Sequence, residues 1–172
     1  MQALLGLSRR IDALNAAVGR ATYWLILAAV LISSGNAVVR KTLSLSSNAL
    51  LEIQWYLFAA VFLLCAGYTL LAREHVRVDL IHSRLSRRGQ LIVEMFGTLV
   101  FLMPVTALIL ALSWAPFVDA FQSGEVSSNA GGLIRWPVKL LIPVGFGLLL
   151  LQGLSELIKD AAALRALGRE SS

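Results

Sequence analysis

The chain has 172 residues, of which 58% are hydrophobic and 15% are charged, and this composition excludes an ordinary water-soluble domain and indicates an integral membrane protein. A formal net charge of +5 could suit nucleic acid, but the basic residues gather at the ends of apolar segments, so no nucleic-acid partner is expected. Cys65 is the only cysteine, which excludes an intrachain disulfide and a cysteine-based metal cluster.

Residues 1–20 have the pattern of an amphipathic helix. Leu4, Leu7, Ile11 and Leu14 recur at steps of three and four, and charged or polar residues occupy the rest of the wheel. We expect this helix to lie along the membrane surface or against a partner. Charges interrupt the segment and no small-residue cleavage pattern follows it, so we also expect it to be retained.

Four later segments are apolar and long enough to cross the hydrocarbon core, which takes about 20 helical residues. They cover about residues 21–39, 53–72, 91–114 and 137–158, and a tail of residues 159–172 follows. The sequence therefore predicts an all-α integral membrane protein with four transmembrane helices in a single membrane domain, residues 1–172.

Lysine and arginine favour the cytoplasmic side of a membrane, so the segments that hold them orient the helices. The first connection has only Arg40 and Lys41, and the third, from Ala115 to Gly132, has Asp119 and Glu125 without a basic residue. The N-terminal segment, the second connection and the tail are more basic, so both termini are predicted to be cytoplasmic. Their basic residues include Arg9, Arg10 and Arg20, then Arg73, Arg77, Arg84, Arg87 and Arg88, then Lys159, Arg165 and Arg169.

Tryptophan favours the membrane interface and gives an independent check on this orientation. Trp24 lies at the predicted cytoplasmic start of the first span. Trp55, Trp114 and Trp136 lie at the predicted outer ends of the other three spans. We therefore expect these four residues to be interface anchors.

The spans nearly lack ionisable residues in their middles, where ion and proton pathways usually place them. Glu94 and Glu156 lie about one turn inside their spans. Both are close enough to the predicted cytoplasmic interface to pair with Arg73, Arg77 or Arg87.

Three further polar residues lie within or at the end of a span. Gln152 is expected to make a hydrogen bond between helices. Asn36 and Arg40 share a helical face one turn apart. Three partners are open for this pair: a lipid headgroup, another chain or Glu52.

Catalytic signals are weak throughout the chain. His75 and His82 are the only histidines, and both lie in the second connection without the further ligands that a metal or haem site needs. There is no phosphate-binding glycine loop and no nucleophile elbow. We therefore expect no enzymatic activity and no cofactor.

The order of several short motifs resembles the small membrane subunit of tripartite ATP-independent periplasmic (TRAP) transporters, the DctQ type. The similarity covers about residues 20–160, and it depends on the order of the motifs within a four-span chain. The motifs are Asn36 to Arg40, Glu52-Ile53-Gln54-Trp55-Tyr56, His75-Val76-Arg77-Val78-Asp79, Glu125-Val126-Ser127-Ser128, Trp136-Pro137-Val138-Lys139 and Pro143-Val144-Gly145-Phe146.

The resemblance implies a noncatalytic protein of a bacterial or archaeal inner membrane that works with two partners. One is a large multi-span membrane subunit, which in this family is understood to hold the sodium and substrate sites and to move as an elevator. The other is a periplasmic substrate-binding protein. The substrate would be an organic acid anion, and the small subunit would scaffold the large subunit and help to dock the binding protein.

Under this reading the outer loops would dock the binding protein. The candidate docking residues are Glu52, Asp119, Glu125, Ser127 and Lys41, with Arg40, Ser128 and Asn129 beside them. Solvated loop residues without a partner are the alternative, because charged rims affect association rate and specificity more than affinity.

The second connection would instead contact the large subunit or lipid, together with Asn36, Arg40 and Gln152. His75, Arg77 and Asp79 alternate with valines, so an extended segment would place them on one side, next to Arg73. The alternative is that this basic connection only enforces topology.

A second functional class is a self-contained, dimeric four-span exporter of small cations. Such a protein needs a membrane-embedded carboxylate that exchanges protons with substrate. Only the peripheral Glu94 and Glu156 are available for that role.

Overall fold

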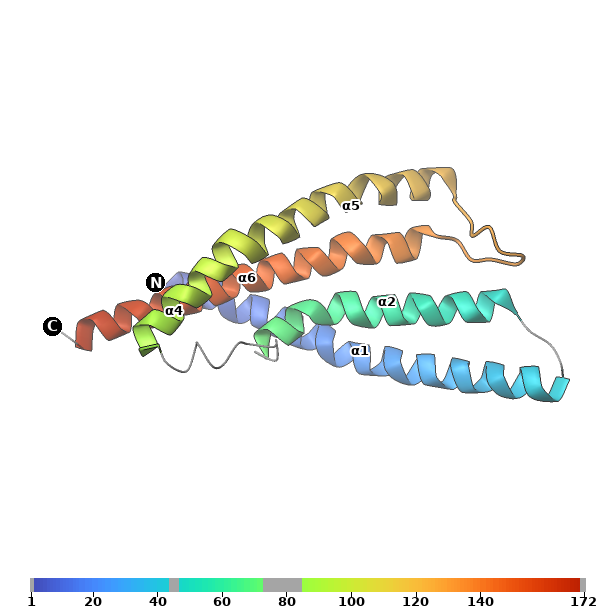
Figure 1. Cartoon of the computed structure of the whole chain (residues 1–172), viewed down its shortest axis with the longest axis horizontal. Helices are drawn as coiled ribbons and strands as arrows, with labels where there is room; N and C mark the ends of the chain where they lie inside the picture. The colour runs from blue at the N-terminus through green and yellow to red at the C-terminus, as the bar shows by residue number, and fades with distance from the viewer. Residues whose placement is uncertain (1, 44–46, 73–84, 171–172) are drawn as a thin grey trace.

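The computed structural model describes residues 2–43, 47–72 and 85–170, almost all of them helical (Figure 1). Among these residues, four helices are long and apolar enough to cross a membrane when α4, η1 and α5 are counted as one. The predicted all-α membrane protein with four spans is confirmed. The elements are α1 (Gln2–Leu43), α2 (Asn48–Leu71), α4 (Arg87–Gly97), the π-helical η1 (Thr98–Leu102), α5 (Met103–Ser123) and α6 (Trp136–Glu170).

The N-terminal segment is not a separate helix, contrary to expectation. Helix α1 runs without a break through the residues assigned to the surface helix and the first span. No proline interrupts this stretch, so nothing in the backbone forces a bend near residue 20. Ser8, Asp12 and Asn15 bond to α6 of the same chain. The polar side of the expected surface helix is therefore used within the protein.

Helix α6 is the central element of the molecule. It packs against α1, α2, α4 and α5, whereas α5 packs mainly on α6. In Figure 1 the long helices form an open layer in the order α5, α6, α2 and α1. Both ends of the chain lie at the opposite end of this layer from the α5–α6 loop.

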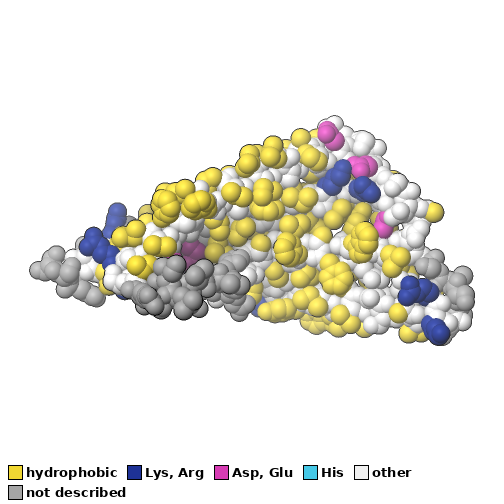
Figure 2. Space-filling model, viewed as in Figure 1, with side chains coloured by type: hydrophobic (Ala, Val, Ile, Leu, Met, Phe, Trp, Pro, Cys, Tyr) yellow, Lys and Arg dark blue, Asp and Glu magenta, His cyan; other side chains and the backbone are white. Residues whose placement is uncertain are grey.

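Large apolar side chains cover the middle of the layer, and charged side chains gather toward its two ends (Figure 2). Trp24, Trp55 and Phe62 are each more than 70% exposed. Apolar side chains of this size, exposed on several helices, are suited to contact with lipid or another membrane protein. The exposed apolar surface is therefore the one expected for the membrane protein that the composition indicates.

The π-helical segment η1 precedes Pro104, and the proline explains it. Proline has no N–H to donate to the carbonyl four residues earlier, and its ring pushes against that carbonyl. A π turn relieves this conflict by widening the helix locally. The Met103 N–H accordingly donates to the Thr98 carbonyl, five residues earlier.

Two glycines let α2 approach its neighbours closely. A β-carbon added at Gly145 of α6 would lie 2.7 Å from the Leu63 carbonyl oxygen of α2. One added at Gly67 of α2 would lie 2.2 Å from Asn15 Oδ1 of α1 and 3.2 Å from the Leu148 carbonyl oxygen. Small residues commonly permit such contacts between membrane helices.

Candidate functional site

The loop between α5 and α6, residues 124–135, is a compact hairpin. Gly124 ends α5 in the left-handed region at φ 62°, which glycine adopts without strain. The Ser127 N–H then donates to the Leu133 carbonyl, and the Arg135 N–H donates to the Glu125 carbonyl, both at 2.9 Å. The loop therefore has a defined backbone path.

Glu52 of α2 attaches this hairpin to the rest of the molecule. One carboxylate oxygen accepts from Ser127 Oγ and, at 2.7 Å, from Asn129 Nδ2. The other accepts from the Leu133 N–H at 2.7 Å. Glu52 is only 7% exposed. Its carboxylate thus holds the loop, and the Glu52 and Ser127 side chains bond to each other. Their role in docking stays a prediction.

Two further contacts join α2 to the hairpin. Asn48 Nδ2 donates to the Ala130 carbonyl at 3.2 Å, and Tyr56 Oη donates to the Ile134 carbonyl at 3.3 Å. Together with Glu52, these residues occupy one face of α2 at steps of four. The first two turns of α2 therefore form a platform for the loop.

Glu125 makes a second anchor within the loop. Its carboxylate accepts a hydrogen bond from Lys139 Nζ and lies 3.6 Å from Arg135 Nη1. The hydrogen bond from Lys139 lowers the pKa of Glu125 more than burial raises it. Sequence reasoning missed both basic partners, although they lie ten and fourteen residues after Glu125 and across the turn. We call Glu52, Glu125, Ser127, Asn129, Arg135 and Lys139 the loop cluster.

Of the other predicted docking residues, all but Asn129 lie near this cluster without belonging to it. Asp119, Arg40 and Lys41 are exposed at the same end of the molecule, as are Ser128 and Asn129 at the turn. They are among the charged and polar groups that this end presents outward. These residues come from three parts of the chain: the end of α1, the end of α5 and the hairpin.

Asn36 and Arg40 do not use Glu52 as a partner. Glu52 is occupied by the hairpin, and Arg40 is exposed. Asn36 is buried, and its Oδ1 has no hydrogen-bond donor among the described residues. Of the three possibilities for this pair, only a headgroup or another chain stays open.

At the opposite end, a network of polar side chains joins α1 to α6. Gln152 is at its centre and is fully buried. It accepts from Asn15 Nδ2 at 2.9 Å, and its amide nitrogen lies 2.9 Å from Asp12 Oδ1 and 3.0 Å from Glu156 Oε1. The expected hydrogen bond between helices is present. The α1–α6 network comprises Ser8, Asp12, Asn15, Gln152, Ser155, Glu156 and Lys159.

Serine and lysine complete this network. Ser155 Oγ lies 2.6 Å from Asp12 Oδ1 and 2.7 Å from Ser8 Oγ. Lys159 Nζ lies 3.2 Å from Asp12 Oδ2 and 2.5 Å from Glu156 Oε1. In both helices, polar residues recur at helical spacing, at positions 8, 12 and 15 of α1 and at positions 152, 155 and 159 of α6. This spacing is the sequence signal from which two facing polar stripes could have been predicted.

Glu156 has an ion-pair partner that the sequence analysis did not name, while its predicted pairing with Arg73 or Arg77 stays a prediction. It pairs with Lys159, three residues later on its own helix, because this spacing brings the two side chains together. Of the arginines proposed, Arg87 directs Nη1 to Gln90 Oε1 at 3.4 Å. Arg73 and Arg77 lie outside the described residues, as do His75 and Asp79.

The four tryptophans lie on the surface or near it. Trp24 and Trp55 are more than 70% exposed, and Trp114 is 56% exposed. Trp136 is partly buried and packs edge-on against Phe121, with ring centroids 5.5 Å apart. Their role as interface anchors stays a prediction.

Within the described ranges, no three histidine, cysteine, aspartate or glutamate side chains are grouped so that they could hold a metal ion. The two polar sites instead contain carboxylates that are bonded to donors of the same chain. Such arrangements can fix helices and loops in place.

Comparison with known proteins gives one match. A family model for the DctQ component of tripartite ATP-independent periplasmic transporters matches residues 29–163, which is most of the chain. No curated protein and no solved structure matches. The match runs from within α1 into α6 and includes the whole hairpin and its Glu52 anchor. The chain therefore belongs to the DctQ family, as its motifs suggested, and is a small membrane subunit of a TRAP transporter.

Proposed function

We propose that this subunit is a noncatalytic scaffold for a sodium-coupled TRAP transporter that imports an organic acid anion. The large membrane subunit would hold the sodium and substrate sites, and the periplasmic binding protein would deliver the anion. The observation that carries the proposal is the attachment of the α5–α6 hairpin to α2 through Glu52. A loop held in this way offers a binding protein a fixed surface.

In this proposal both termini face the cytoplasm of a bacterial or archaeal cell, and the hairpin faces the periplasm across the inner membrane. Both chain ends lie opposite the hairpin, as this topology requires (Figure 1). The positions of the lysines and arginines support the same direction. The hairpin end holds Arg40, Lys41, Arg135 and Lys139, whereas the other eleven belong to the N-terminal segment, the second connection and the C-terminal part of the chain.

Docking is tested with Asp119→Lys, because Asp119 is exposed and lies beside the hairpin without bonding to it through its side chain. Uptake at limiting binding protein should fall, while the amount of assembled membrane complex stays constant. The matched control is Ala166→Lys, which adds a lysine at the exposed opposite end. Unchanged uptake in Asp119→Lys would contradict docking at this end.

The second connection is proposed to contact the large subunit or lipid through Arg73, His75, Arg77 and Asp79. Reversing the charge of Arg77 or Asp79 should reduce both uptake and copurification of the large subunit. Normal uptake with normal assembly in both variants would refute this role. Substrate transport by liposomes that contain this chain alone would favour the exporter instead.

A further inference from the structure

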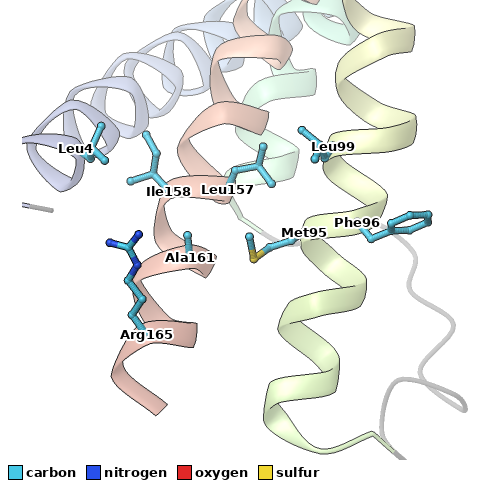
Figure 3. Close-up of a pocket in the computed structure, with 8 residues that line it drawn as sticks. All are labelled: Leu4, Met95, Phe96, Leu99, Leu157, Ile158, Ala161 and Arg165. Atoms are coloured by element: carbon cyan, nitrogen blue, oxygen red, sulfur yellow. The ribbon is translucent and has the colours of Figure 1, made fainter. Parts of the chain in front are cut away.

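An apolar crevice lies at the end of the molecule that holds the chain termini, between α1, α4, η1 and α6 (Figure 3). Its volume is about 360 Å³. The walls come from Leu4 of α1, Met95 of α4, Leu99 of η1, and Leu157 and Ile158 of α6. Leu4 and Leu99 are at least half exposed, so the crevice is open along one side.

One charged residue, Arg165, lines this otherwise apolar crevice. It lies one turn after Ala161 and two turns after Ile158, on the same face of α6. In Figure 3 its side chain extends back along α6 toward the apolar side chains. Arg165 is exposed and makes no hydrogen bond or ion pair with any residue that the structure describes. Its guanidinium is therefore available to an anion.

The π-helical segment contributes to the shape of this crevice. Leu99 belongs to η1, and the neighbouring Leu102 and Thr98 pack over Gly153 of α6. The steric conflict between the Pro104 ring and the preceding turn therefore affects the crevice, because the widened π turn sets how η1 lies against α6. Single π turns are frequent at functional sites.

We propose that this crevice binds one anionic phospholipid, with an acyl chain against the apolar walls and the phosphate on Arg165. An open apolar groove in a bilayer is filled by hydrocarbon, and arginine pairs with phosphate through two parallel N–H groups. Basic pockets between membrane helices on the cytoplasmic side commonly bind such headgroups. The site needs only a membrane and does not depend on the binding protein.

The test is native mass spectrometry of the full chain with phosphatidylglycerol or phosphatidylcholine. Wild type should retain phosphatidylglycerol better. Arg165→Gln should weaken its retention about fivefold and leave phosphatidylcholine unchanged, as expected for one arginine near an anionic surface. The control Arg10→Gln removes an exposed arginine outside the crevice and should have no effect. Equal loss in both variants, or no loss in Arg165→Gln, would overturn the site.

Ala161→Trp tests the acyl chain, because Ala161 lines the crevice. It should reduce phosphatidylglycerol retention, whereas Ala166→Trp on the exposed side of α6 should not.

Retention of glycerol phosphate without acyl chains would show a headgroup site alone and contradict the proposal. A photoreactive residue at position 161 should crosslink lipid in the assembled complex, and a crosslink to the large subunit would assign the crevice to protein instead.

Discussion

The two polar sites of this protein use the same chemistry to hold different kinds of structure. In the α1–α6 network, two helices face each other, and Gln152 joins Asn15, Asp12 and Glu156. In the loop cluster, one helical carboxylate, Glu52, holds a hairpin about 75 residues away in the chain. The first site fixes the packing of long helices, and the second fixes the shape of a surface. Damage to the first should therefore cost stability, and damage to the second should cost local order.

The largest effect is expected from Gly67→Ala. The new β-carbon would lie 2.2 Å from Asn15 Oδ1, so α1, α2 and the network between α1 and α6 would have to shift. Overpacking of this kind costs about 1–3 kcal/mol, and the thermal midpoint in detergent should fall. Gly147→Ala is the control, because nothing lies within 4 Å of its added β-carbon. The double variant Asn15→Ala/Gly67→Ala should lose less than the sum of the two single variants. An additive loss would show that the oxygen is not the obstacle.

The next largest effect is expected from Gln152→Leu. It removes the amide that joins three polar side chains in a buried position and leaves Asn15 Nδ2 with weaker contacts only. An unsatisfied buried polar group costs about 1–3 kcal/mol, and the unfolding free energy should fall accordingly. Gln122→Leu on the exposed surface of α5 is the comparison and should change little. If both variants melt alike, Gln152 does not hold the network together.

Glu52→Gln should loosen the hairpin without unfolding the helices. An amide nitrogen cannot accept the bonds that one carboxylate oxygen now receives, so either the Leu133 N–H or the Ser127 and Asn129 side chains lose their acceptor. Hydrogen exchange at Leu133 should rise about tenfold in either case, because its N–H loses its acceptor directly or the hairpin loses the two side-chain bonds that hold it closed. Asp119→Asn should leave that exchange as it is. Protection at Leu133 equal to wild type would contradict the role given to Glu52.

The smallest effect concerns pH at Glu125. Its pKa is lowered in the folded protein by the hydrogen bond from Lys139, so the interaction contributes stability above the ordinary glutamate pKa. That contribution is lost as the pH falls through the lowered pKa. The thermal midpoint of Glu125→Gln should therefore lie slightly below wild type at neutral pH and converge with it in acid. A difference that persists at the lowest pH would exclude titration of Glu125 as the cause.

Local patterns predicted much of the helical content. Apolar length indicated four spans. Gln152 was recognised as a contact between helices because an amide in an apolar span needs a partner. The family could also be predicted, because the order of the motifs along the chain is informative even when each motif is short.

The sequence by itself determined the class of this protein, because long apolar segments with few charges leave a chain only a helical solution in a membrane. The tertiary structure decided the partners. Glu52 faces Ser127, Asn129 and Leu133, and Asp12 faces Ser155 and Lys159, only after helices distant in the chain have packed. Periodicity gives the face on which a side chain lies, but the partner depends on how the helices assemble, and no local pattern contains that information.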